Sequence, residues 1–150
     1  MAEREAQVGI VNGVVSIRNP RYPEIAALEA GALADTGALF LCVPEHIQVQ
    51  LRLEVIDHKE VTLADGSRRL VPYAGPIELR FKNRVGYFGA LVLGDQVLLG
   101  AIPMEDMDLV VIPRTRTVDV NPDNPNFASA ILKAAARAPA PRRGEVVFSP

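Results

Sequence analysis

The apolar segments of this sequence are short, and turn-forming residues interrupt them about every 8–12 residues. Residues 77–81 (Ile-Glu-Leu-Arg-Phe) alternate apolar and polar side chains, which is typical of a strand with one solvated face. An Asp-Gly pair at 65–66 separates residues 60–63 from residues 68–72, and this arrangement predicts a hairpin with a tight turn. Many short strands joined by such turns predict an all-β sandwich or barrel.

The other expected strands follow from runs of apolar and β-branched residues. They lie at 8–18 (a strand, or a hairpin turning at Asn12-Gly13), 25–34, 39–43, 85–93, 96–99, 109–112 and 115–120. Residues 45–53 fit two patterns, because Ile47 to Val55 alternate as a strand does while Pro44 and Glu45 suit a first helical turn. A short helix that passes into a strand near Leu53 satisfies both patterns, and Pro103 begins a second short helical segment.

The chain is long enough for one domain with a real core, since it has 150 residues of which 49% are hydrophobic. We expect residues 1–126 to form this domain. Residues 127–150 form an Ala-, Pro- and Arg-rich tail, in which 127–137 have a helical pattern and 138–143 resemble a disordered linker.

Composition excludes several classes of partner. The net charge of −2, the 5% aromatic content and the absence of Trp argue against nucleic acid. One cysteine, Cys42, allows no intrachain disulfide, the N-terminus is polar, and no run approaches the roughly 18 apolar residues of a membrane span. We therefore expect a cytoplasmic protein that does not enter membranes.

Most common catalytic arrangements are missing from the sequence. His46 and His58 have no further ligand at zinc-binding spacing, no serine lies in a Gly-x-Ser-x-Gly elbow, and no glycine-rich phosphate loop is present. Cys42 reads as a small core residue. The remaining candidate is Asp35.

Asp35 ends an apolar run and is followed by Thr36 and Gly37. The glycine lets the backbone turn sharply and come close to a ligand, although Asp-Thr-Gly alone is also compatible with an ordinary turn. Residues 98–101 (Leu-Leu-Gly-Ala) repeat the step from an apolar strand to Gly-Ala.

These features resemble the retropepsin-like (retroviral-type) aspartic protease family, and its bacterial single-domain members most closely. The resemblance covers about residues 8–126. It is carried by residues 34–38 (Ala-Asp-Thr-Gly-Ala), 61–67 (Val-Thr-Leu-Ala-Asp-Gly-Ser), 90–94, 97–103 and 104–109.

The resemblance implies a closed β-barrel with one or two short helices that works as a homodimer. Asp35 would be the catalytic residue, one from each subunit. Thr36 would join the two loops across the two-fold axis, Gly37 would present its carbonyl group to substrate, and Ala38 would complete the loop. Two further groups of residues would assist: a supporting segment at Leu98, Leu99 and Gly100, and a flap at Ala64, Asp65, Gly66 and Ser67.

The implied activity is that of an aspartic endopeptidase without metal or organic cofactor. Two carboxylates about 3 Å apart share one proton, so one can activate water while the other acts as acid. A single Asp-Thr-Gly supplies only half of this pair, which is why the mechanism needs a second copy. The alternatives are a peptide-binding or dimerisation module with little or no hydrolysis on the same fold, and an unrelated β-domain.

The sequence departs from the retroviral members at two places. They carry an acidic residue just after Asp-Thr-Gly-Ala, whereas Leu39 and Phe40 are apolar here. Their flap tip is glycine-rich, whereas this one is Asp-Gly-Ser followed by Arg68 and Arg69. Both departures affect how a polypeptide substrate would be bound.

Overall fold

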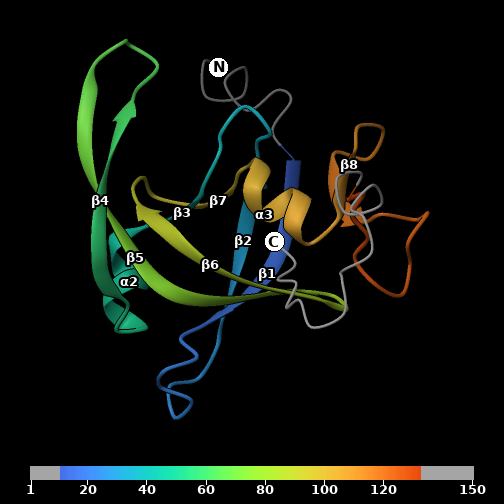
Figure 1. Cartoon of the computed structure of the whole chain (residues 1–150), viewed down its shortest axis with the longest axis horizontal. Helices are drawn as coiled ribbons and strands as arrows, with labels where there is room; N and C mark the ends of the chain where they lie inside the picture. The colour runs from blue at the N-terminus through green and yellow to red at the C-terminus, as the bar shows by residue number, and fades with distance from the viewer. Residues whose placement is uncertain (1–10, 133–150) are drawn as a thin grey trace, which may run out of the picture.

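The computed structural model describes residues 11–132, which form a closed β-barrel (Figure 1). Six strands pair in a ring, and the pairing of β1 with β5 closes it. In order around the ring they are β1 (Val11–Arg18), β2 (Leu28–Ala34), β7 (Val97–Leu99), β3 (Leu41–Val43), β6 (Arg84–Val92) and β5 (Arg68–Phe81).

The remaining elements are attached to this ring. Strand β4 (Glu54–Thr62) pairs with β5 in a long hairpin that projects from the barrel (Figure 1). Strands β8 (Leu109–Ile112) and β9 (Thr117–Val120) form a second hairpin, joined to β1 through β9. Helix α2 (Glu45–Gln50) connects β3 to β4, and α3 (Ala101–Asp106) follows β7.

The core fills the barrel with aliphatic side chains from all six ring strands and the two helices. The fully buried members include Ile17, Leu41, Leu51, Ile77, Leu79 and Leu99. One buried polar residue, Asn19, donates hydrogen bonds from Nδ2 to the carbonyl groups of Leu51 (2.8 Å) and Arg52 (3.2 Å). These bonds tie the loop after β1 to the end of α2 and leave the amide group satisfied.

The structure confirms the closed all-β barrel with two short helices. It also resolves the ambiguous segment, because α2 ends at Gln50 and β4 starts at Glu54, a helix that passes into a strand. The predicted hairpin turns at residues 63–67, where Gly66 has a φ of +86° that glycine adopts without strain.

Of the two interpretations of the first segment, the strand is confirmed over residues 11–18. Asn12-Gly13 lies inside β1, paired with Leu33 and Ala32 of β2, because the ladder with β2 overrides the turn preference. Gly75-Pro76 lies inside β5, where the strand register shifts between Ala74 and Ile77 and so accommodates the proline. One local prediction was wrong, because Glu78, expected on a solvated face, is only 7% exposed.

Glu78 is nonetheless well partnered at this buried position. It accepts a hydrogen bond from the hydroxyl of Tyr87 (2.9 Å) and lies 3.4 Å from the Nε of Arg80 and 4.0 Å from the guanidinium of Arg18. The Tyr87 hydrogen bond is the main cause that lowers the pKa of Glu78, followed by the two arginines, so the carboxylate stays charged.

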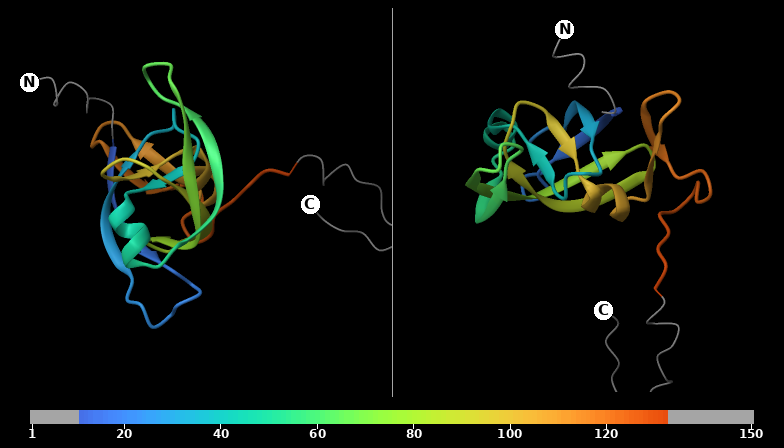
Figure 2. Two further views of the ribbon diagram at one scale, coloured as in Figure 1. Left: turned by 90° about the vertical axis from the view of Figure 1, so that its left-hand side faces the viewer. Right: turned by 90° about the horizontal axis from the view of Figure 1, so that it is seen from above.

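The last described residues leave the barrel as an extended segment (Figure 2). The helix predicted from 127 onward is absent over residues 127–132, and residues 133–137 lie outside the described part. Nothing packs against the apolar side chains at 127, 131 and 132, so tertiary contacts do not support a helix there. None of the helices in residues 11–132 has the length and apolar character needed to cross a membrane.

Candidate active site

The loop after β2 carries the candidate acid, Asp35, directly beyond the last strand residue. Its backbone N–H donates to the carbonyl of Leu99 (3.0 Å), and its own carbonyl accepts from the N–H of Ala38 (3.1 Å). Its side-chain Oδ1 accepts from the N–H of Gly37 (2.9 Å). The turn chemistry of Asp-Thr-Gly thus fixes the orientation of an exposed carboxylate.

The repeated sequence step is explained by pairing of the two strands that carry it. Strands β2 and β7 run parallel, with Leu33 opposite Leu98 and Ala34 opposite Leu99. Beyond the strands, the N–H of Ala101 donates to the carbonyl of Ala38 (2.8 Å). The Asp35 loop therefore rests on Gly100 and the start of α3, which directly follow β7.

Gly100 makes this close approach possible. A Cβ atom at position 100 would lie 2.5 Å from the carbonyl oxygen of Phe40 and 2.7 Å from that of Leu39. Both are backbone atoms, so any larger residue would force the two loops apart.

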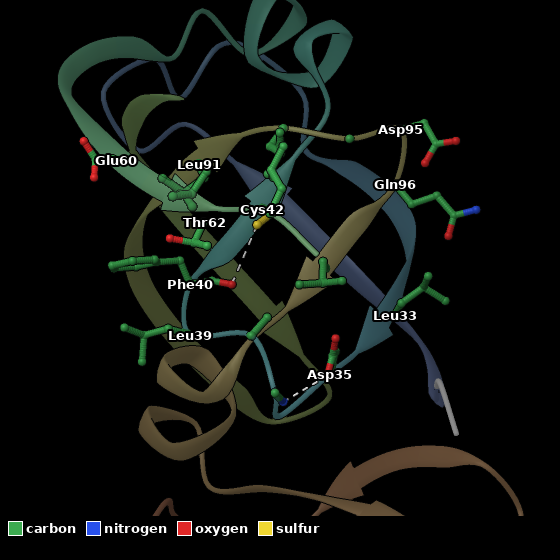
Figure 3. A pocket seen from close by; sticks show the side chains of 17 residues that line it. Leu33, Asp35, Leu39, Phe40, Cys42, Glu60, Thr62, Leu91, Asp95 and Gln96 are labelled. Carbon is green, nitrogen blue, oxygen red and sulfur yellow. Dashed lines mark hydrogen bonds between the residues drawn. The ribbon is translucent and has the colours of Figure 1, made fainter. Parts of the chain in front are cut away.

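The Asp35 carboxylate faces a pocket of about 520 Å³ between the barrel and the β4–β5 hairpin (Figure 3). Most of its lining is apolar and comes from β2, the loop after it, β6, β7 and β4. The lining residues are Leu33, Asp35, Gly37, Ala38, Leu39, Phe40, Cys42, Glu60, Val61, Thr62, Leu63, Leu91, Leu93, Gly94, Asp95, Gln96 and Leu98.

The charged residues that line this pocket are all acidic, while one cation, the ammonium of Lys59 on β4, lies over the ring of Phe40 at its wall. Asp35, Glu60 and Asp95 belong to the lining, and it includes no Lys, Arg or His. Glu60 is partly compensated by Arg68, whose guanidinium lies 3.4 Å away on the exposed side of the hairpin. The pocket is suited to an apolar ligand that carries positive charge nearby.

The sequence-predicted site residues fall into three groups. Asp35, Gly37, Ala38 and Leu98 line the pocket. Thr36 is exposed beside Asp35, while Leu99 and Gly100 are buried behind the loop. The hairpin-tip residues Ala64, Asp65, Gly66 and Ser67 are exposed and lie outside the lining.

The pocket is instead covered by the arm of the same hairpin. Residues 60–63 line it, whereas at the tip the Ser67 N–H (2.8 Å) and hydroxyl (2.5 Å) bind the carboxylate of Asp65. These hydrogen bonds lower the pKa of Asp65 and stabilise the turn.

Several lining residues were missed by sequence reasoning, among them Glu60, Leu91 and Asp95. Only the closure of the ring shows that β6 and the turn after it reach the same pocket as Asp35. Cys42 also lines the pocket, and burial raises the pKa of its thiol, which keeps it in the unreactive protonated form.

We looked in the described part of the chain for side chains that could hold a metal ion. Residues 11–132 contain no group of three His, Cys, Asp or Glu side chains placed to hold a metal ion. His46 and His58 are exposed, as expected for surface histidines.

A cation–aromatic cluster joins the hairpin arm to the pocket wall. The Nζ of Lys59 on β4 lies 4.7 Å from the ring centroid of Tyr73 and 5.4 Å from that of Phe40. The two rings are in edge contact, with centroids 6.2 Å apart. Tyr73 lies against Gly89 of β6, where a Cβ atom would be only 2.2 Å from its ring.

Comparison with known proteins rests on structure, since no family model and no curated protein sequence matches this chain. The barrel is similar to EIAV protease complexed with the inhibitor HBY-793, with a TM-score of 0.50, 17% identity, and coverage of 63% of this chain and 85% of that one. At this identity the likeness concerns the fold.

Two other solved structures align at lower TM-scores. The retroviral protease-like domain of Ddi1 from Leishmania major gives 0.49, with 10% identity over 75% of this chain and 89% of that one. Simian foamy virus (mac) protease gives 0.40, with 18% identity over 61% and 91%. The likeness to EIAV protease and the closed ring of strands together show that this chain has the retropepsin-like β-barrel fold.

Proposed function

We propose that this protein is a homodimeric aspartic endopeptidase whose catalytic pair consists of Asp35 from each of two subunits. The observation that carries the proposal is the placement of Asp35. Its carboxylate is oriented by Gly37 N–H at the end of a buried strand and faces an apolar pocket large enough for peptide side chains. The retropepsin-like barrel supports the same reading.

The need for a second copy follows from the surroundings of Asp35. Within residues 11–132, the side chain of Asp35 makes one hydrogen bond, which it accepts from the N–H of Gly37. No second carboxyl group in these residues pairs with the Asp35 carboxylate. Two-fold symmetry would bring the same loop to the axis twice and supply the partner. Thr36, which is exposed beside Asp35, would form the contact between the two loops.

In the proposed reaction, the ionised Asp35 takes a proton from a water molecule, whose oxygen adds to the peptide carbonyl carbon. The protonated Asp35 of the other subunit donates its proton toward the carbonyl oxygen. As the C–N bond breaks, the leaving nitrogen receives the proton that the first Asp35 took from water. One hydroxyl group of the tetrahedral intermediate returns a proton to the second Asp35, and the products are a carboxylic acid and an amine. The β4 arm over the pocket would limit the access of bulk water.

The test compares Asp35→Asn with Asp95→Asn, which removes another charge from the same pocket. We expect the parent and Asp95→Asn to cleave an unfolded protein substrate, as read by mass spectrometry, and Asp35→Asn to cleave none. Sedimentation should show all three as dimers. Cleavage by Asp35→Asn at the parental rate would overturn the proposal, and peptide binding by a parent that never cleaves would indicate a binding module.

A further inference from the structure

The two most exposed large apolar side chains described in this chain, and a third that is also well exposed, lie in one short segment. Phe127 is 82% exposed and Ile131 83%, and Leu132 reaches 68%. The segment 127–132 is extended and makes no backbone–backbone hydrogen bonds with the rest of residues 11–132. Within residues 11–132, the backbone of this segment is hydrogen-bonded through the N–H of Ser129, which donates to Asp108. An extended segment that carries exposed apolar side chains has the form of a peptide ligand.

This segment leaves the barrel from a fixed anchor (Figure 2). The carboxylate of Asp108 accepts hydrogen bonds from the Nδ2 atoms of Asn121 (3.1 Å) and Asn124 (2.8 Å) and from the N–H of Ser129 (3.1 Å). The guanidinium of Arg84 also binds the carbonyl of Asn124. The anchor holds residues 121–129 in place, with the side chain of Phe127 exposed among them, and the exposed side chains of Ile131 and Leu132 lie beyond it.

The pocket at Asp35 complements the segment in polarity. Leu33, Leu39, Leu91, Leu93 and Leu98 are among its apolar lining residues. Its lining is more apolar than those of two smaller cavities in residues 11–132, one beside Glu45 and one beside Tyr73.

The pocket lining and the sequence after Leu132 also carry opposite charges. The lining contains three acids and no basic residue, whereas the sequence after Leu132 contains four basic residues (Lys133, Arg137, Arg142 and Arg143) and one acid, Glu145. Placing these cations near the acidic lining would speed and strengthen association.

We propose that the pocket at Asp35 binds residues 127–132 of another copy of this chain. The tail is then a built-in ligand that competes with other peptides for the cleft. The inference rests on the proposed function only for the position of the peptide-binding cleft, since docking does not require hydrolysis.

The first test measures binding without turnover. A fluorescent peptide of sequence 127–140 is titrated with the full-length Asp35→Asn protein, and anisotropy is recorded. We expect saturable binding that weakens as salt increases and is at least about tenfold weaker for a peptide with Ile131→Asp and Leu132→Asp. Equal binding of a scrambled peptide, or no binding, would overturn the proposal.

The second test removes the competing tail within the intact chain. Full-length protein with Asp35→Asn, Ile131→Asp and Leu132→Asp should bind the labelled peptide more tightly than Asp35→Asn alone, because its own tails no longer occupy the cleft. Val49→Asp is the matched control, since Val49 is 63% exposed on α2 and away from the lining. Tighter binding by the control as well would contradict a specific tail site.

These measurements separate the two proposals. Binding by Asp35→Asn supports the tail site even when the parent shows no cleavage. If the parent cleaves other polypeptides but Asp35→Asn does not bind the tail peptide, the proposed tail site is overturned and the proposed protease activity is not affected.

Discussion

Gly100 is the residue on which the position of the Asp35 loop most directly depends. Replacing it with Ala puts a Cβ atom against the backbone of Leu39 and Phe40. We expect Gly100→Ala to lower the free energy of unfolding by about 1–3 kcal/mol, as overpacking does, and to reduce peptide cleavage sharply. Urea unfolding and a cleavage assay measure the two effects.

The matched control is Gly31→Ala in β2. A Cβ atom at position 31 would have no neighbour within 4 Å, so we expect a change in stability within about 0.5 kcal/mol. A loss for Gly31→Ala equal to that for Gly100→Ala would mean that general strand effects, rather than the contact between the loops, explain the result.

Asp108 gives a pH-dependent prediction at the same scale. Its pKa is lowered, first by the hydrogen bond from Asn121, then by those from Ser129 N–H and Asn124, and also by the charge of Arg84. Because the folded pKa is below the ordinary value, the stabilisation is present above that ordinary value and is lost as pH falls through the folded pKa. Residues 121–129 should therefore detach from Asp108 as the pH falls through the folded pKa of its carboxyl group.

The measurement is a carboxyl NMR titration together with amide exchange at Ser129. Asn121→Ala should move the Asp108 pKa up toward its ordinary value, and Ser129 should exchange faster as the pH is lowered through that pKa. Titration of Asp108 at or above the ordinary aspartate value in the parent would contradict the anchor.

At the scale of elements, the β4 arm and the pocket wall are joined by Lys59, Phe40 and Tyr73. We expect a double-mutant cycle of Lys59→Gln with Tyr73→Leu to show a coupling of about 0.5–1 kcal/mol, the range for exposed cation–π contacts. Lys59→Gln should raise KM with little change in kcat, since the arm lines the proposed peptide-binding cleft away from Asp35, and Lys59→Arg should restore KM.

The control cycle pairs Lys59→Gln with Phe81→Leu, because the ring of Phe81 contacts Lys82 instead. We expect coupling near zero there. Equal coupling in both cycles would show that Lys59 acts through overall stability rather than through the cluster.

Local sequence signals predicted most elements because the relevant interactions are close along the chain. Asp-Gly at 65–66 set the hairpin, and Pro44-Glu45 set the start of α2. The hairpin alternative at Asn12-Gly13 does not hold, because the ladder partners of these residues lie in β2 and β9, more than fifteen residues away. Pairing over such distances overrides a two-residue turn preference.

The candidate site was predictable only in part for a similar reason. Asp35 stood out by residue type, and the second Gly-Ala step at 100–101 indicated its supporting loop. The rest of the lining comes from β4, β6 and the turn before β7, which meet only when β1 pairs with β5 and closes the barrel. No local sequence pattern at Glu60 or Asp95 indicates that these residues line the same pocket as Asp35.

For the whole molecule, the central claim is that each subunit supplies half of one active site. The most direct measurement mixes parent and Asp35→Asn subunits in equal amounts, allows them to exchange, and follows peptide cleavage. If the catalytic pair is shared, only dimers of two parental subunits are active, and about one quarter of the parental rate should remain. A residual rate of about one half would mean that each subunit acts alone, and would contradict the shared pair.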